Sequence, residues 1–238
     1  MIKIYDTPDL LITALADFVV QTAKDSIQLR GKFDFVLSGG SSPKRLYELL
    51  ASDSHRELID WSRVCFFFGD ERNVPHDHPD SNYLMVTRAL FQPLTIADKQ
   101  IFPINTAKMP TQAATDYEQL VRNHFEPGHY GFDLILLGLG DNSHTASLFP
   151  HTAVLHEQHA LVKEVFVPEV NMYRITLTAP LINAGRNVAF LVYGASKAEA
   201  VYHIIKGERN IESHPAQLIK PSSGKLMWFL DQEAAKKL

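Results

Sequence analysis

A histidine follows a short apolar run in a pattern that suits catalysis. The run Phe132–Leu137 is followed by Gly138, Gly140 and His144 in the sequence GLGDNSH. A short, mostly apolar run between glycines predicts a buried strand of a parallel sheet, and ligands of open α/β sheets bind just beyond the carboxyl ends of such strands. We therefore predict that this strand delivers His144 to an active site, near a helix N-terminus that keeps the imidazole neutral and able to act as a general base. The competing interpretation is a hydrogen-bonded core histidine.

A glycine turn early in the chain has the local plan of a phosphate site. The apolar run Phe33–Leu37 is followed by SGGSSPK, in which Ser42 and Pro43 suit the start of a helix. The turn matches neither the Walker A loop nor the G-x-G-x-x-G fingerprint. Backbone N–H groups and the helix dipole can still bind an anion there, so we predict phosphate binding by Gly39, Gly40, Ser41 and Ser42. A tight strand-to-helix turn without a ligand is the alternative.

Three cationic side chains are candidates for binding the same anion. Ser196 and Glu199 have capping-box spacing, which puts Lys197 in the first turn of a helix, where the macrodipole disfavours a cation. A bound anion reverses that preference. Arg72 offers a planar guanidinium that suits phosphate, and Arg174 lies in a segment that alternates apolar and polar residues. The plainer interpretation of each arginine is a surface charge.

The segment GDERNVPHDHPDSNY is a polar loop after another predicted strand, and such loops tend to carry function. We expect its first acid, Asp70, or the adjacent Glu71 to orient the histidine or a sugar hydroxyl. His76 and His78 alternate as chelating ligands do, but no third and fourth ligands follow at a recognisable spacing. We therefore predict a solvated loop and no metal site, with an adventitious ion as the alternative.

Hydrophobic periodicity predicts the elements that position these residues. The predicted strands, besides those already named, are Ile2–Tyr5, Val64–Phe68, Ala160–Val167, Tyr173–Thr178, Asn187–Tyr193 and Leu226–Leu230. Two helices are predicted to begin at Thr7-Pro8 and at Ser42. Four more are predicted over Ser81–Phe91, Thr111–Phe125, Ser196–Gly207 and the tail DQEAAKKL. This alternation predicts an α/β fold in one domain over residues 1–238. Its centre is a Rossmann-like, doubly wound, mostly parallel sheet flanked by helices.

The composition narrows the function classes. A formal net charge of -4 and a pI near 6.2 give no general attraction to nucleic acid. Cys65 is the only cysteine, which excludes an intramolecular disulfide and a cysteine-rich zinc site. The sequence has neither a signal-peptide pattern nor an apolar run long enough to span a bilayer, so we expect a cytoplasmic protein without a membrane partner.

The combined motifs resemble the 6-phosphogluconolactonase family over nearly the full chain. The matching segments are LSGGSSP, FFFGDERNVPHDHPDSNY, LLGLGDNSHTASLFP, YRITLTAPLINAGRNVAFLVYGASKAEAV and PAQLIKPSSGKLMWFLD. The resemblance implies a sugar-phosphate isomerase-like fold and hydrolysis of 6-phospho-D-glucono-1,5-lactone to 6-phospho-D-gluconate in the oxidative pentose phosphate pathway. It implies no cofactor, and its ligand is a small sugar-phosphate lactone. We expect a monomer or a weak homodimer.

In the resulting hypothesis, Arg72, Lys197 and the glycine turn hold the phosphate, with Arg174 assisting. His144 deprotonates the attacking water, and backbone N–H groups near Gly140 stabilise the oxyanion.

Two positions separate this family from the glucosamine-6-phosphate deaminases, which are similar around the glycines. The deaminases carry a glutamate five residues after the histidine, where this chain has Phe149, and an aromatic residue where Arg72 stands. Both positions favour the lactonase. The pair Asn142-Ser143 replaces the Asp-Gly that usually precedes the histidine, which leans toward the deaminase and leaves open which group supports His144. A deaminase/isomerase and a non-catalytic sugar-phosphate sensor remain the alternatives.

Overall fold

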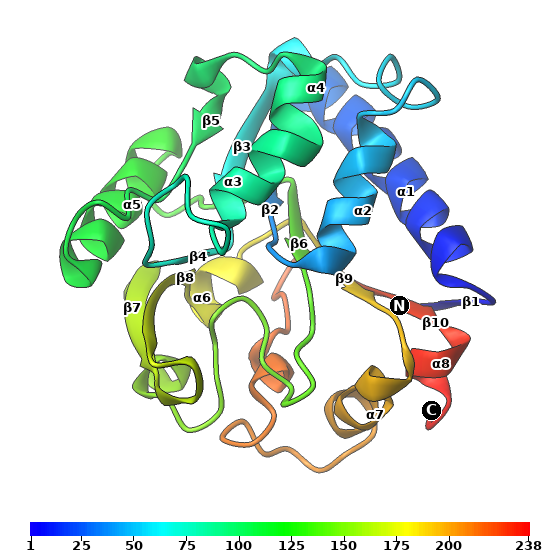
Figure 1. Cartoon of the computed structure of the whole chain (residues 1–238), viewed down its shortest axis with the longest axis vertical. Coiled ribbons are helices and arrows are strands. Elements are labelled where there is room, and N and C mark those ends of the chain that lie inside the picture. The colour runs from blue at the N-terminus through cyan, green and yellow to red at the C-terminus, as the bar shows by residue number, and fades with distance from the viewer.

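The computed structural model describes residues 1–238 and is built on two sheets (Figure 1). The main sheet has seven parallel strands in the order β1-β10-β9-β6-β2-β3-β5. Their bounds are β1 Ile2–Tyr5, β2 Phe33–Leu37, β3 Val64–Phe68, β5 Ile101–Phe102, β6 Leu134–Leu137, β9 Asn187–Val192 and β10 Lys225–Asp231. Three strands form a separate antiparallel sheet: β4 Asp70–Arg72, β8 Met172–Leu177 and β7 Val162–Val167.

Eight α-helices accompany the sheets. Their bounds are α1 Pro8–Arg30, α2 Ser41–Leu50, α3 Asn82–Val86, α4 Gln92–Leu94, α5 Pro110–His124, α6 Ala179–Asn183, α7 Ala198–Ile205 and α8 Gln232–Ala235. A π-helical turn, Thr87–Phe91, joins α3 to α4. Helices α1 and α2 lie side by side, and α8 lies beside the β1–β10 edge of the main sheet (Figure 1). None of these helices combines the length and the apolarity needed to cross a membrane.

The parallel main sheet flanked by helices confirms the predicted fold class. Every residue of β2 and of β6 is buried, as expected for central strands that helices cover on both faces. Residues of both sheets, including Phe35 in β2 and Ile175 in β8, belong to one hydrophobic cluster. The second sheet is therefore packed onto the first, and its position relative to the main sheet is fixed by apolar burial.

The direction in which the chain adds strands to the main sheet reverses between β2 and β6. From β2 the chain proceeds outward through β3 and β5, whereas from β6 it proceeds the other way through β9 and β10. The two strands are neighbours, with Phe35 opposite Leu134 and Val36 opposite Ile135. Ligands of doubly wound folds bind at this switch point, outside the carboxyl ends of the strands. The glycine turn follows β2 and the His144 segment follows β6, so both lie at this place.

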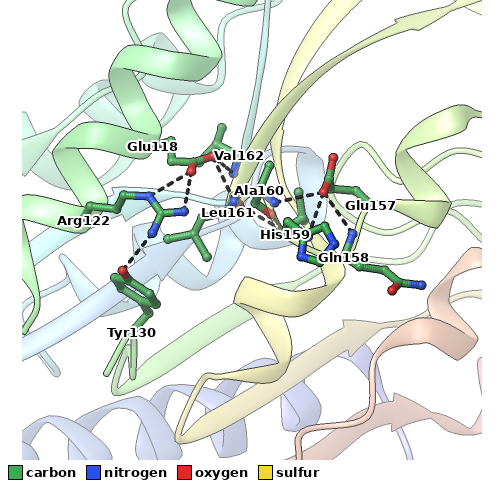
Figure 2. Close-up of polar contacts among 10 residues, drawn as sticks. Glu118, Arg122, Tyr130, Glu157, Gln158, His159, Ala160, Leu161 and Val162 are labelled. Carbon is green, nitrogen blue, oxygen red and sulfur yellow. Dashed lines mark hydrogen bonds and ion pairs between the residues drawn. The ribbon is translucent and has the colours of Figure 1, made fainter. Parts of the chain in front are cut away.

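The second sheet is also attached to α5 by a half-buried carboxylate. Glu118 of α5 accepts hydrogen bonds from the backbone N–H groups of Leu161 and Val162, at 2.9 and 3.2 Å, where β7 begins (Figure 2). The same carboxylate accepts from Arg122, at 2.6 Å, and Arg122 in turn donates to the hydroxyl of Tyr130 (Figure 2). This network holds the hairpin of β7 and β8 against the helix layer, and that hairpin carries Arg174.

Candidate active site

The carboxyl ends of β2 and β6 open into a cleft with a volume of about 620 Å³, a size that suits a small ligand. All nine residues predicted from the sequence line this cleft: His144, Asp70, Gly39, Gly40, Ser41, Ser42, Arg72, Arg174 and Lys197. They come from segments that lie far apart in the sequence, and the two sheets together bring them to one place.

His144 is held by a tight turn, and no helix begins beside it. The N–H of Gly140 donates to the carbonyl of His144 at 2.8 Å, and the N–H of Ser143 donates to the carbonyl of Gly140 at 3.0 Å. Ser143 and Ala146 have left-handed φ angles of 66° and 47°, which a right-handed helix does not allow. The helix N-terminus predicted at His144 is therefore wrong. The Gly140 N–H, expected near an oxyanion, is already engaged by the turn.

Three neighbours fix the imidazole ring of His144. Its Nδ1 lies 2.5 Å from Oδ1 of Asn142, and its plane stacks on Phe149 with the ring centroids 4.0 Å apart. Gly140 lies directly against the ring, because a Cβ at that position would be 2.1 Å from Nδ1. An amide oxygen only accepts hydrogen bonds, so Nδ1 carries the proton and Nε2 keeps its lone pair. The ring therefore has a defined tautomer with a basic nitrogen.

The pKa of His144 is lowered to about 4, chiefly because burial disfavours the imidazolium. The positive charges of Lys197 and Arg174 lower it further, while Asp70 and Asp141 partly oppose them. The imidazole is thus neutral, as predicted, but the cause is desolvation by burial and not the dipole of a helix. At neutral pH the ring is uncharged and able to accept a proton.

Asp70 lines the cleft but does not contact the imidazole. One of its carboxylate oxygens accepts a hydrogen bond from the Ser147 hydroxyl at 2.6 Å, and the other faces Nδ2 of Asn82 at 3.3 Å. The group bonded to the ring of His144 is therefore Asn142 and not Asp70, whereas the alternative role of Asp70, orienting a sugar hydroxyl, stays a prediction. Asp70 acts on His144 through its charge.

Glu71, the other acid expected to orient His144 or a sugar hydroxyl, bonds instead to the start of a helix. Its carboxylate accepts the backbone N–H groups of Asn82 and Tyr83, both at 2.7 Å, and the hydroxyl of Ser81 at 3.2 Å. These groups lie at the N-terminus of α3, where unpaired N–H groups favour an anion. Burial raises the pKa of Glu71, and the backbone hydrogen bonds oppose that rise. Glu71 therefore anchors the helix that follows the loop.

Arg72 and Arg174 face each other across the second sheet. They are direct register partners of the antiparallel pair β4 and β8, and each has a buried Nε without a hydrogen-bond partner. Burial and the nearby charge of Arg72 both lower the pKa of Arg174. Like charges directly opposite on two strands destabilise a sheet, and an unpaired buried donor is costly. An anion between the two guanidinium groups would remove both penalties.

The glycine turn leaves its N–H groups open to the cleft. Gly40, with φ of 102°, is the residue that caps α2, and no side chain bonds the first turn. The cap predicted at Ser42 is therefore wrong, because the capping residue is Gly40, two residues earlier, and helix α2 begins at Ser41. Gly39 lies so close to Asn82 that a Cβ would be 1.9 Å from its Oδ1, so a side chain at this position would displace the Asn82 amide. Free N–H groups at a ten-residue helix form a ready anion site.

Lys197 faces the cleft in an ion pair. Its Nζ lies 2.6 Å from Oδ1 of Asp141, and the Ser196 hydroxyl also donates to Asp141, at 3.3 Å. The capping box predicted from Ser196 and Glu199 does not form, since α7 begins only at Ala198 and has no side-chain cap. The hydrogen bond from Lys197 holds the pKa of Asp141 below its usual range. A ligand anion would therefore share Lys197 with Asp141.

Several contacts of the site were not predicted. No local pattern predicts that Asn142 bonds the imidazole or that Phe149 stacks on it, although both residues differ from those of the related motifs. His76 points elsewhere, with its Nε2 2.8 Å from the carbonyl of Ile104. Another group of metal-ligand types, Asp34, Cys65 and His124, lies outside the cleft, where the ammonium of Lys32 already pairs with it.

Comparison with known proteins gives one consistent family. Residues 6–228 match the family model described as glucosamine-6-phosphate isomerases/6-phosphogluconolactonase. A 6-phosphogluconolactonase of Synechocystis is 44% identical over 217 residues, which cover 90% of this chain and 88% of that protein. A 6-phosphogluconolactonase of Bos taurus is 36% identical over 242 residues, which cover 100% and 93% of the two chains. The solved 6-phosphogluconolactonase from Trypanosoma brucei superposes with a TM-score of 0.88 at 30% identity, covering 100% of this chain and 98% of that one.

Proposed function

This chain belongs to the glucosamine-6-phosphate isomerase and 6-phosphogluconolactonase family, and we propose that it hydrolyses 6-phospho-D-glucono-1,5-lactone to 6-phospho-D-gluconate with His144 as the general base. The activity is that of a carboxylic ester hydrolase acting on a sugar lactone. One observation carries the proposed mechanism: Nδ1 of His144 is bonded to Oδ1 of Asn142, which leaves Nε2 free. Burial lowers the pKa of this imidazole to about 4, so we expect the ring to be neutral at neutral pH. A base in that state can take a proton from water.

The phosphate of the lactone is held between the two sheets in this proposal. The open N–H groups of the glycine turn bind it from the main sheet, and Arg72 and Arg174 bind it from the second sheet; the turn consists of Gly39, Gly40, Ser41 and Ser42. Lys197 supplies a further positive charge, which it shares with Asp141. Guanidinium groups and helix N-termini are both well matched to a phosphate dianion. The phosphate thus orients the lactone ring against His144.

The proposed reaction has two proton transfers at His144. Nε2 accepts a proton from water while the water oxygen attacks the lactone carbonyl carbon, which gives a tetrahedral intermediate. The bond from that carbon to the ring oxygen then breaks, and the imidazolium returns the proton to the leaving oxygen, which becomes a hydroxyl. The new carboxylic acid ionises in water, so each turnover releases one proton.

A proton-release assay with a matched variant tests this proposal. Wild-type protein should open freshly generated lactone faster than the spontaneous reaction, and His144→Ala should lose about 10²- to 10⁴-fold in kcat because the base is missing. Phe149 and Gly140 remain in that variant, so circular dichroism should show an unchanged fold. Turnover by His144→Ala near the wild-type rate would remove His144 from the mechanism.

An ammonia assay with glucosamine 6-phosphate separates the lactonase from its nearest rival. A glucosamine-6-phosphate deaminase releases ammonia, and Phe149 occupies the place where those enzymes have a glutamate. We expect no ammonia from glucosamine 6-phosphate. Ligand-induced stabilisation without any turnover would instead support a sugar-phosphate sensor. That the protein is cytoplasmic, and that it is a monomer or a weak homodimer, remain predictions.

A further inference from the structure

Glu169 connects the second sheet to the residue that holds His144. It lies in the 3₁₀ turn Pro168–Val170 between β7 and β8 and lines the same cleft. Its Oε2 accepts a hydrogen bond from Nδ2 of Asn142 at 3.1 Å. The oxygen of the same amide lies 2.5 Å from Nδ1 of His144. The Glu169–Asn142–His144 triplet is thus a continuous line of hydrogen bonds that ends at the proposed base.

We propose that Glu169 is a positioning residue of the lactonase, which fixes the tautomer of His144 by fixing the amide of Asn142. The inference rests on the proposed role of His144. A carboxylate only accepts hydrogen bonds, so it holds the NH₂ end of the amide toward itself and the oxygen toward the imidazole. A reversed amide would place its oxygen against the carboxylate and its NH₂ against Nδ1. The imidazole proton would then move to Nε2, and the free lone pair needed to deprotonate water would be lost.

A second contact supports the same amide orientation but is weak. Oδ1 of Asn142 also accepts the backbone N–H of His144, at 3.3 Å, which is long for such a bond. Glu169 is therefore needed to strengthen an orientation that the turn alone holds loosely. Because Glu169 is exposed, its contribution is that of one ordinary hydrogen bond to a charged group.

The triplet also explains why asparagine precedes Ser143 in this chain. An aspartate at position 142 would place a second carboxylate at hydrogen-bond distance from Glu169, and two anions so close repel each other. With asparagine at position 142, the nearest carboxylate in this line is that of Glu169, which bonds Asn142 and does not touch the imidazole. The ring is oriented without an adjacent anion that would stabilise the imidazolium, so His144 stays neutral.

Nitrogen-15 NMR of the imidazole tests the tautomer directly and does not depend on turnover. In the wild type, and in Glu169→Gln, whose amide oxygen can still accept, His144 should show a protonated Nδ1 and an unprotonated Nε2. Glu169→Ala should show mixed tautomers and a fall in kcat of about 3- to 10-fold at unchanged KM. Glu164→Ala, in the same hairpin but outside the cleft, is the charge-matched control and should equal the wild type.

An exchange of the two side chains provides the second test. Asn142→Asp alone should be less active than Asn142→Asp combined with Glu169→Gln, because the double variant removes the repulsion. The double variant should also lose activity at a higher pH than the wild type, since an adjacent carboxylate favours the imidazolium. The other charges facing His144 are unchanged in all variants: Asp70, Asp141, Lys197 and Arg174.

Two results would overturn the role of Glu169. They are a wild-type tautomer and kcat in Glu169→Ala, and equal activity of the Asn142→Asp variants whatever residue stands at position 169. Neither result would affect the lactonase proposal, which depends on wild-type turnover and on its loss in His144→Ala. Conversely, an inactive wild type with the expected imidazole tautomer would remove the lactonase and leave the triplet in place.

Discussion

At the residue scale, the chemistry of this site depends on keeping one imidazole uncharged among several charges. Two cations, Lys197 and Arg174, and two anions, Asp70 and Asp141, act on His144, and their effects on its pKa oppose each other. Burial is the largest influence and decides the outcome. The stack on Phe149 contributes to that burial, because the aromatic face covers one side of the ring.

We expect His144 to remain neutral as the pH is lowered to about 4. A general base works only in its unprotonated form, so the part of the activity loss that is due to His144 should appear as the pH falls through that value. An NMR titration of the imidazole, assigned with His144→Ala, measures this without interference from ionisation of the substrate phosphate. A titration midpoint near 6.5, the ordinary histidine value, would contradict the prediction.

The same lowered pKa has a consequence for folding stability. Between pH 6.5 and about 4 the unfolded chain binds a proton at His144 that the folded chain does not, so this residue's contribution is complete above pH 6.5 and is lost as the pH falls toward 4. Chemical denaturation at several pH values should therefore show a smaller decline over this window in His144→Ala than in the wild type. An identical decline would mean that the imidazole protonates freely in the native state.

At the element scale, the strength of each local signal explains which predictions succeeded. Strands β2 and β3 have the predicted bounds because short apolar runs between polar residues define them, and Thr7 caps α1 as its sequence indicates. Strand β4 was predicted as part of a loop. It is a strand only because Asp70–Arg72 pairs with β8, about a hundred residues later, and no local pattern encodes that pairing.

Helix starts near the cleft were the least predictable elements. The serine at position 42 resembles a cap, yet the helix begins after Gly40, whose left-handed φ leaves N–H groups free. Ser196 likewise bonds Asp141 and caps nothing. Both departures from capping rules lie beside the cleft. There, N–H groups and side chains that would otherwise cap a helix are left available to a ligand.

Two glycines of the turn after β6 give a matched test of how that element positions the base. A Cβ at Gly140 would lie 2.1 Å from Nδ1 of His144, whereas a Cβ at Gly138 would be 3.8 Å from the Ser38 hydroxyl, an ordinary contact. We expect Gly140→Ala to displace the ring and reduce kcat by about 10²-fold or more, the scale of losing a positioned base. Gly138→Ala should retain most of the activity. Lactone hydrolysis with stopped-flow detection of proton release measures both, and equal activity of the two variants would contradict this geometry.

At the scale of the whole molecule, the cleft exists only because two sheets meet. The main sheet contributes His144 and the open N-terminus of α2, while the second sheet contributes Arg72 and Arg174. The type and local context of each of these residues were enough to predict, one residue at a time, that it takes part in a site. Their arrangement, with two arginines directly opposite each other, depends on the pairing of β4 with β8, which only the folded chain reveals.

This arrangement predicts that an anion stabilises the protein by joining the two sheets. Inorganic phosphate at about ten times its Kd should add roughly 1.4 kcal/mol, which raises Tm by about 3–6 °C for a chain of this size. Arg174→Gln should remove most of that increase and leave Tm without phosphate equal to or above that of the wild type, because it relieves the repulsion from Arg72. Arg88→Gln, an exposed change of the same charge, is the control and should keep the full response. Differential scanning fluorimetry over a phosphate series measures all three proteins, and an equal phosphate response in Arg174→Gln and the wild type would show that the opposed arginines do not bind the anion.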